Sequence, residues 1–251
     1  MKPLLRWLVL LAVAVLVLQL FFVARIAVMA RLDPQSTSFQ RSEAWRLQRD
    51  KGRLPWRQSW VPYAQISDSL KRAVIASEDD GFSNHDGVDW DALEKAWQKN
   101  SRAEAQAAKA QASRKPGTAN AGKPVPRAPK VVGGSTITQQ LAKNLFLSGE
   151  RTLLRKGQEF VLTLLLEALL DKQRILEIYL NSVEWGEGVF GAEAAAQHYF
   201  RKPASMLSTY EAARLAVMLP RPKYFEKLPN SSYLAERAQH IAARLNSAEL
   251  P

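Results

Sequence analysis

The sequence predicts a mainly α-helical protein in which one membrane-spanning helix precedes a helical body. Three observations predict this class. Residues 7–24 form an apolar stretch, apolar side chains recur at helical spacing in residues 158–181, and no run of strand length alternates apolar with polar residues. The chain has 251 residues, 47% of them hydrophobic and 24% charged, which is typical of a globular protein of one domain or at most two.

The apolar stretch 7–24 is interrupted by Gln19 and approaches the ~20 residues that a helix needs to cross a membrane. Basic residues flank both of its ends: Lys2, Arg6, Arg25 and Arg31. Because these charges are nearly balanced, they orient the span weakly, and we expect an uncleaved anchor with residues 1–6 in the cytoplasm. The alternative is a signal peptide cut near Val28 and Ala30, but the stretch exceeds the ~7–15 apolar residues of such signals.

A membrane-proximal segment is expected over residues 31–60, before a body at 61–251. Tryptophans among arginines in this segment suit the lipid interface, and ordinary surface packing explains them almost equally well. The first helix of the body is predicted from a cap at Ser67 to Glu78, and the next over about 89–99.

A mobile basic loop is expected at 100–130, because its alanines, lysines, arginines, prolines and glycines bring no large apolar side chains to bury. It is either a solvated insertion or a segment held near anionic lipid. Residues 158–181 predict one buried helix or a helix pair. The last clear helix starts at Ser208, has Glu211 in capping-box position and ends before Pro220.

The charge balance narrows the classes of partner. The chain carries 35 basic and 24 acidic side chains, a net charge of +11, which favours anionic partners such as a diphosphate, anionic lipid or nucleic acid. It has no cysteine, so disulfides, thiolate nucleophiles and cysteine metal sites are excluded. Its three scattered histidines lack the short paired spacing of zinc sites.

Glu78 is the first candidate for acid–base chemistry. It follows Val74 by four residues and Leu70 by eight, so its carboxylate falls on the apolar stripe of its helix. Apolar surroundings raise the pKa of a carboxyl and suit it to general acid–base work near neutral pH. A glutamate followed by Asp79 and Asp80 is also typical of a solvated helix end.

Residues 133–144 place a pair of glycines before the N-terminus of a helix. Free backbone N–H groups at such an end, capped by Ser135 or Thr136, favour a bound phosphate. The spacing from glycine to lysine differs from that of a P-loop, so nucleotide hydrolysis is disfavoured. An ordinary capped amphipathic helix, with Gln140 and Lys143 on its polar face, explains the segment as well.

Residues 151–159 gather three cations and Glu159 directly before the apolar helix. The cations are Arg151, Arg155 and Lys156. Because cations oppose the positive end of a helix dipole, a bound phosphate among them is one interpretation. A solvated basic turn is the other.

Five motifs in order along residues 60–225 resemble the peptidoglycan glycosyltransferases of glycosyltransferase family 51, in particular its stand-alone members. They are Glu78-Asp79-Asp80-Gly81-Phe82-Ser83-Asn84-His85-Asp86-Gly87, then Gly133-Gly134-Ser135-Thr136-Ile137-Thr138-Gln139-Gln140-Leu141-Ala142-Lys143-Asn144, then Arg151-Thr152-Leu153-Leu154-Arg155-Lys156-Gly157-Gln158-Glu159, then Ile175-Leu176-Glu177-Ile178-Tyr179-Leu180-Asn181, and finally Glu211-Ala212-Ala213-Arg214-Leu215-Ala216. The family is anchored by a single membrane span, which agrees with residues 7–24.

The resemblance implies a role for each matching residue. Glu78 is the general base, and Lys143, Arg151 and Arg155 neutralise a leaving diphosphate. Glu159 occupies a second acidic position, which orients a cation or a divalent metal or acts as an acid. The remaining positions line the donor site or support the loop that carries the base: Ser135, Gln139, Gln140 and Asn144 line the site, and Asp79, Phe82 and His85 support the loop.

The resemblance also implies a lysozyme-like fold and a reaction. Lipid II is polymerised into β-1,4-linked glycan by an inverting displacement that releases undecaprenyl diphosphate. The partners implied are lipid II, the lipid-linked glycan chain, the membrane and proteins of division or cell-wall synthesis, but no nucleic acid. The implied location is the bacterial inner membrane, with the catalytic domain in the periplasm. No cofactor is required and no metal site is expected, with Mg²⁺ or Mn²⁺ an option at the diphosphate.

Two alternatives and one departure stand beside this interpretation. A silent membrane scaffold that binds lipid II would not need the intact Glu78 and Glu159. A muramidase-like hydrolase has no use for Lys143, Arg151 and Arg155 together, because its leaving group is a sugar hydroxyl. The basic stretch 100–130 is longer than the family's mobile loop, which leaves the role of that stretch open.

Overall fold

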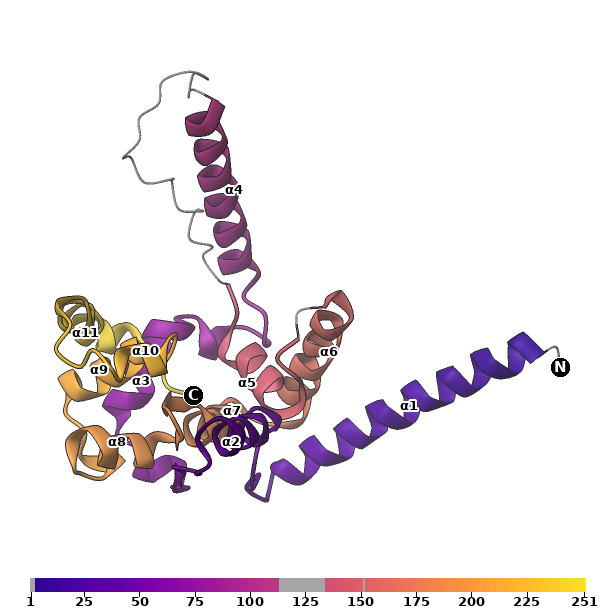
Figure 1. The fold of residues 1–251 in the computed structure, drawn as a ribbon, viewed down its shortest axis with the longest axis horizontal. Coiled ribbons are helices and arrows are strands. Elements are labelled where there is room, and N and C mark those ends of the chain that lie inside the picture. The colour runs from indigo at the N-terminus through magenta and orange to yellow at the C-terminus, as the bar shows by residue number, and fades with distance from the viewer. Residues whose placement is uncertain (1–2, 113–133, 151) are drawn as a thin grey trace. The chain divides into compact units, whose positions relative to one another are not determined.

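The computed structural model describes residues 3–112, 134–150 and 152–251. Contacts divide the chain into a main unit, Met1–Gly87 with Thr136–Pro251, and a smaller unit, Val88–Ser135. Helices dominate the described residues, so the predicted mainly α-helical class is confirmed (Figure 1).

The main unit is built from α-helices joined by short 3-10 turns. Its helices are α1 (Pro3–Met29), α2 (Ser38–Lys51), α3 (Asp68–Glu78), α5 (Ile137–Phe146), α6 (Leu153–Leu169), α7 (Lys172–Ser182), α8 (Ala192–Phe200), α9 (Thr209–Met218), α10 (Pro222–Phe225) and α11 (Ser232–Arg244). The 3-10 turns are η1 (Tyr63–Gln65), η2 (Phe82–Asn84), η3 (Ala204–Met206) and η4 (Leu245–Ser247).

Local side-chain caps set the starts of several helices, as the sequence predicts. The Ser67 hydroxyl accepts a hydrogen bond from the Leu70 N–H at the start of α3. Thr136 caps α5 and Ser208 caps α9, each in a reciprocal capping box. The apolar run 158–181 is a helix pair, because Asp171 caps α7 and so separates it from α6.

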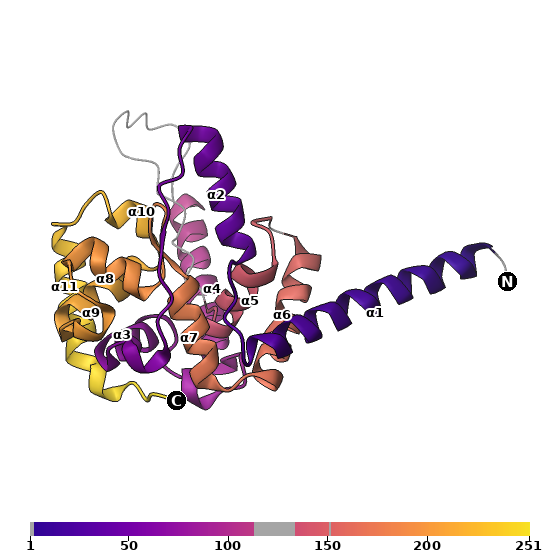
Figure 2. The same ribbon diagram turned by 90° about the horizontal axis from the view of Figure 1, so that it is seen from below.

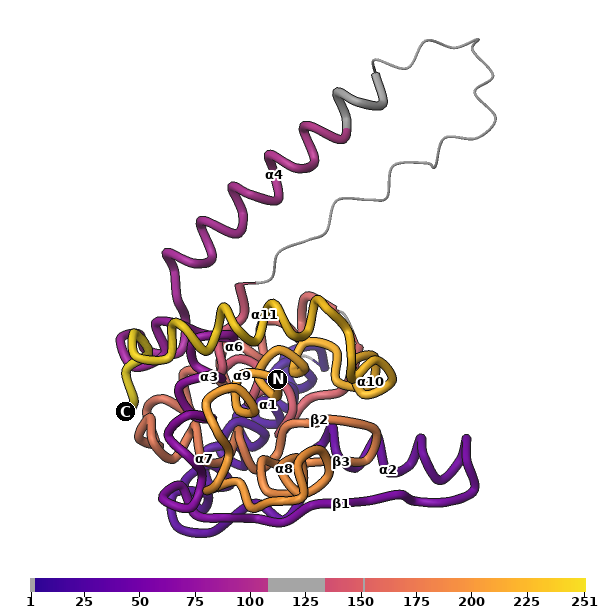
Figure 3. The backbone as a smooth tube through the Cα atoms, turned by 90° about the vertical axis from the view of Figure 1, so that its left-hand side faces the viewer, coloured from indigo at the N-terminus to yellow at the C-terminus, as the bar shows by residue number. Residues whose placement is uncertain are grey.

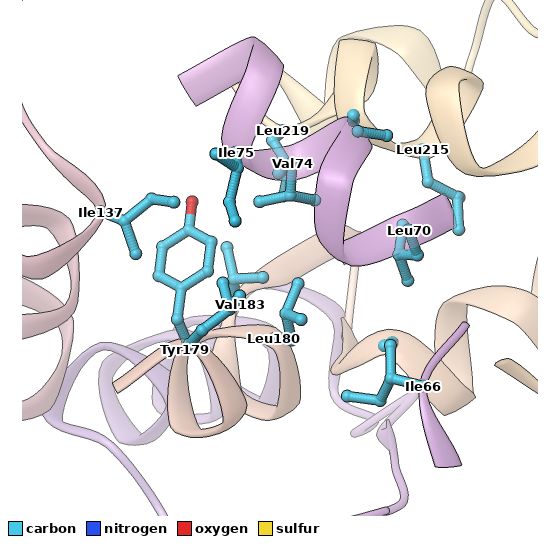
Figure 4. Close-up of a cluster of buried hydrophobic side chains, with 14 of the residues drawn as sticks. Ile66, Leu70, Val74, Ile75, Ile137, Tyr179, Leu180, Val183, Leu215 and Leu219 are labelled. Carbon is cyan, nitrogen blue, oxygen red and sulfur yellow. The ribbon is translucent and has the colours of Figure 1, made fainter. Parts of the chain in front are cut away.

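The core that positions Glu78 lies where α3, α5, α7 and α9 meet (Figure 4). Leu70, Val74 and Ile75 of α3 are fully buried there. Tyr179 of α7 and Leu215 of α9 face them in the same cluster. Because one face of α3 is held by this packing, the last residue of α3, Glu78, has a fixed place beside α5.

The apolar N-terminal helix is longer than the expected 7–24 and ends inside the main unit. Among the described residues, α1 is the one helix long and apolar enough to cross a membrane. Its last turns bury Phe22, Ile26 and Met29 against the body, while the rest extends away (Figure 2). Gln19 exchanges hydrogen bonds of 3.0 and 3.2 Å with Gln158 of α6, which accounts for the polar interruption.

A small sheet escaped the sequence analysis because its strands have two or three residues. In Figure 3, β1 (Arg57–Gln58), β3 (Val189–Phe190) and β2 (Glu184–Gly186) lie in that order. The first pair is parallel and the second antiparallel. This pairing, and the full burial of Leu47 of α2, makes the membrane-proximal residues 31–60 part of the main unit.

The smaller unit contains α4 (Trp90–Ala112), which replaces part of the expected loop. The helix predicted at 89–99 is present, but the expectation of a loop is wrong for 100–112, which continues the same helix. Alanine, glutamate, glutamine, lysine and arginine dominate this stretch, and their helix propensity supports a helix without a large buried face. The rest of the expected loop, 113–130, lies outside the described residues.

Gly87 has a left-handed backbone conformation and packs closely against α6, and a substitution there tests both features. Its φ is +83°, and a Cβ there would meet the Thr163 Cγ2 at 2.7 Å and the Glu167 Cγ at 2.8 Å. Gly87→Ala should therefore lower the free energy of unfolding by about 1 to 3 kcal/mol. The midpoint of thermal unfolding of the detergent-purified chain measures this. Gly149→Ala is the control, because its Cβ would meet nothing within 4 Å, and equal midpoints for the two variants would contradict the prediction.

Candidate active site

Glu78 is a largely desolvated carboxyl at the C-terminal end of α3. Burial raises its pKa, and the neighbouring charge of Asp79 raises it further. A hydrogen bond of 3.0 Å from the Gln140 Nε2, and the charge of Lys143, act in the opposite direction. The predicted desolvation of Glu78 is thus present, although its named neighbours are polar or charged, and the raised pKa suits the carboxyl to take a proton.

Gln140 of α5 is held in one orientation by Tyr179. The Tyr179 hydroxyl, which is buried, donates a hydrogen bond of 3.0 Å to the Gln140 Oε1. Because the amide oxygen is occupied in this way, the amide nitrogen faces Glu78. Tyr179 belongs to a recognised motif, but its role depends on a contact between α7 and α5, which the sequence does not reveal.

Asp79 ties the loop after α3 to the start of α5. Its buried carboxylate accepts hydrogen bonds from the Ile137 N–H at 2.9 Å and from the His85 Nε2 at 2.8 Å. The His85 Nδ1 accepts from the Gly87 N–H at 3.1 Å, so the neutral tautomer with hydrogen on Nε2 satisfies both contacts. Phe82 is buried with its ring edge-on to His85. These contacts fit the expected supporting role.

Asp80 does not converge with the other two carboxylates. It is exposed and pairs with Arg244 at 2.8 Å. The solvated helix end that the sequence left open therefore describes Asp80, whereas Glu78 and Asp79 face the interior.

A cavity of about 570 Å³ opens beside Gln140. Its lining includes four of the predicted site residues, namely Gln140, Lys143, Asn144 and Arg155. Lys143 is exposed to solvent, yet desolvation within the cleft lowers its pKa. Glu159 raises this pKa, Arg155 and Lys156 lower it, and Glu78 raises it more weakly. Lys143 thus interacts electrostatically with both predicted catalytic carboxylates.

Glu159 is buried and bound by the cations of its own helix. Arg155 donates from Nη1 to Oε2 at 2.8 Å, and the Lys156 Nζ donates to Oε1. The anion that the sequence analysis sought near these cations is therefore present in the chain itself. Among the described residues, however, the Arg155 Nε is buried without a hydrogen-bond partner. The arrangement leaves donor capacity at the cavity wall for a further anion.

Three predicted site residues are placed differently or not described. Gln139 uses its side-chain oxygen to accept from the Thr136 N–H in the α5 cap, so its main visible role is structural. Ser135 is exposed and belongs to the smaller unit. Arg151 lies outside the described residues. Substrate binding by these three residues stays a prediction.

The sequence analysis missed an acidic group in the same cavity. Glu184 of β2 and Glu43 of α2 line it, and Lys223 contacts both carboxylates. The signal available was a glutamate placed between two apolar residues, Val183 and Trp185. In the part of the chain that the structure describes, no three His, Asp or Glu residues form a metal site.

A helical body behind one long apolar helix, with a desolvated carboxyl beside a cleft lined by cations, fits an enzyme that acts on an anionic substrate. The profile of the transglycosylase family matches residues 49–112 and 117–246. A biosynthetic peptidoglycan transglycosylase of Burkholderia thailandensis is 55% identical over 93% of this chain and 82% of its own length. Proteins of the same name from Paraburkholderia xenovorans and Herminiimonas arsenicoxydans are 51% and 50% identical, over 96% and 100% of this chain and 90% and 99% of their own.

The chain therefore belongs to the transglycosylase family, and it is a peptidoglycan glycosyltransferase. The expected resemblance is confirmed by this match. The particular roles of the site residues stay predictions.

The contact between Tyr179 and Gln140 predicts a change in pH dependence. In Tyr179→Phe the Gln140 amide loses its fixed orientation, so its hydrogen bond to Glu78 weakens and the pKa of Glu78 rises. A base works when ionised, so the acid limb of the glycosyl-transfer rate should move about 0.4 to 1 pH unit upward. Rates measured from pH 5 to 9 test this, with Tyr210→Phe as an exposed control. An unmoved limb in Tyr179→Phe would contradict the prediction.

Proposed function

We propose that this glycosyltransferase polymerises lipid II into β-1,4-linked glycan and releases undecaprenyl diphosphate. The donor is the lipid-linked glycan chain, and the acceptor is the free hydroxyl of the terminal sugar of lipid II. The observation that carries the proposal is the hydrogen bond between Glu78 and Gln140, because Gln140 lines a cavity whose wall also bears Lys143 and Arg155.

In the proposed reaction Glu78 accepts the proton of the acceptor hydroxyl. The hydroxyl oxygen forms a bond to the anomeric carbon of the donor as the bond from that carbon to the diphosphate oxygen breaks. A single displacement inverts the configuration at this carbon. Burial supports the role of base, because it keeps the pKa of Glu78 above that of an exposed glutamate.

Negative charge develops on the leaving diphosphate and needs cations more than it needs a proton. Lys143 and Arg155 line the cavity and are assigned to this charge, with Lys156 beside them. The buried Glu159 fixes Arg155 through a hydrogen bond of 2.8 Å, so we assign it to orienting that guanidinium. Arg151 is assigned to the same anion from the family motif. A divalent cation such as Mg²⁺ or Mn²⁺ at the diphosphate stays a prediction, as does activity without any cofactor.

We further propose that the chain is a single-pass protein of a bacterial inner membrane, with its catalytic unit in the periplasm. Besides α1, helix α6 supports membrane contact, since it exposes Leu153, Leu154, Val161 and Leu164. A lipid-linked substrate requires the site to lie near the membrane surface. Proteins of division or cell-wall synthesis are proposed as further partners, and nucleic acid is not.

The function is tested by following labelled lipid II in the presence of the detergent-purified chain. Wild type should produce glycan chains on a gel, and Glu78→Gln should reduce the rate at least about 100-fold because the general base is lost. The matched control is Asp80→Asn, whose exposed carboxylate faces Arg244 and should leave the rate nearly unchanged. Binding of lipid II without glycan formation by wild type would favour the scaffold, and cleavage of glycan would favour the hydrolase.

The orientation is tested by labelling introduced cysteines, because the chain has none of its own. Asn230→Cys lies at an exposed turn of the main unit and should react with a membrane-impermeant maleimide once the outer membrane is permeabilised. Lys2→Cys should react after the inner membrane is also opened. The reverse order of labelling would place the catalytic unit in the cytoplasm.

A further inference from the structure

The cavity beside Gln140 contains two groups of charged residues from different elements. Cations from α5 and α6, with Glu159, form the first group. The second group consists of Glu43 of α2, Glu184 of β2 and Lys223 of α10. The proposed function uses the first group and gives the second no role.

Glu184 is the unusual member of the second group. Its side chain is 7% exposed, and its Oε1 has no hydrogen-bond partner among the described residues. The Lys223 Nζ lies 3.3 Å from this oxygen, which is close enough for an ion pair but is not aligned for a hydrogen bond. Burial raises the pKa of Glu184 to about 7, although Lys223 opposes the rise. A buried carboxyl with unused capacity in a cavity wall indicates a missing polar partner.

The charges around Glu184 restrict the chemical class of the missing partner. Glu43 and Glu184 are offset by Lys223 and by Arg46, which binds Glu43 at 2.8 Å, so the group as a whole is nearly neutral. Because the group is nearly neutral, neither a cationic ligand nor a diphosphate gains much there. A neutral group that donates hydrogen bonds, such as an amide N–H or a hydroxyl, fits best.

The apolar part of the lining agrees with a sugar as the source of this group. It comprises Phe39, Leu147, Val183, Leu219, Pro220 and Pro222. Apolar walls with a few placed polar groups are typical of sites for small organic ligands, and a volume of about 570 Å³ lies within the usual range. A sugar ring offers apolar C–H faces to such walls and polar groups to a carboxyl.

We propose that Glu184 is a further substrate-binding residue, which hydrogen-bonds an amide N–H or a hydroxyl of an N-acetylated hexosamine in the lipid-linked substrate. This inference rests on the proposed function, because that function supplies the sugar diphosphate. Lys223 and Glu43 hold the carboxyl in place. In this arrangement Glu184 binds the sugar, and Lys143 and Arg155 bind the diphosphate of the same substrate.

The test compares two probes, lipid II and undecaprenyl diphosphate, which carries no sugar. Equilibrium binding of each probe to the detergent-purified full chain is measured for wild type, Glu184→Met and Glu184→Gln. Loss of one hydrogen bond should weaken lipid II binding about 3- to 10-fold in Glu184→Met, while undecaprenyl diphosphate binding should change less than about twofold. The amide of Glu184→Gln retains an acceptor and should restore most of the affinity for lipid II.

Two control variants separate this role from a structural one. Glu187→Met removes a carboxylate that pairs with Arg46 and Lys51 and does not line the cavity, so both affinities should stay at the wild-type level. Arg155→Gln should weaken both probes, because it acts on the diphosphate. Thermal unfolding of each variant shows whether it is folded.

Unchanged lipid II affinity in folded Glu184→Met and in folded Glu184→Gln would overturn the inference. So would an equal loss for both probes, because it would indicate a general effect on the cavity. If wild type binds both probes with the expected selectivity but forms no glycan, the proposed function fails while the sugar contact stands.

Discussion

The active site depends on one buried carboxylate, that of Asp79. Its two oxygens join segments separated by more than fifty residues, because one accepts from the His85 ring and the other from the first N–H of α5. A carboxylate at a helix N-terminus is favoured by the helix dipole as well as by the hydrogen bond. Through this link the end of α3, which carries Glu78, and the start of α5, which carries Gln140, form one rigid element. The placing of Glu78, the proposed base, follows from a neighbour to which the proposed reaction gives no chemical role.

Three cations in or beside the cleft, Arg155, Lys156 and Lys223, each have a carboxylate counter-charge within the protein. Arg155 and Lys156 bind Glu159, and Lys223 binds Glu43 and contacts Glu184. Buried cations without such partners would be costly to desolvate. In the proposed reaction the diphosphate shares the cations with Glu159, which holds Arg155 and Lys156 in place. Pre-organised cations of this kind stabilise the charge that develops on a leaving group.

Helix α6 connects the membrane anchor to this cleft. Its Gln158 binds Gln19 of α1, and its Arg155 and Glu159 face the substrate cavity or the cations around it. An amide pair within an apolar helix contact satisfies both polar groups and fixes the register of α1 against α6. The apolar helix α1 is therefore packed against an element that also contributes to the cleft.

The sequence by itself determined the helical class, the apolar N-terminal helix and the caps of α3 and α9, and it offered a desolvated Glu78 and a Thr136 cap of α5 each as one of two alternatives. These features depend on local spacing, and local hydrogen bonds and periodicity are readable from neighbouring residues. The tertiary structure decided the rest. Local patterns fix neither the contacts between elements nor the directions of side chains. Three features therefore depend on the tertiary structure: the hydrogen bond from Tyr179 to Gln140, the binding of Glu159 by its cations, and the place of Glu184 in the cavity. The helical course of 100–112 was misjudged because low hydrophobicity indicated a loop, whereas helix propensity alone supports that stretch. The strands were missed because a strand of two residues can be recognised only from its pairing with a neighbouring strand.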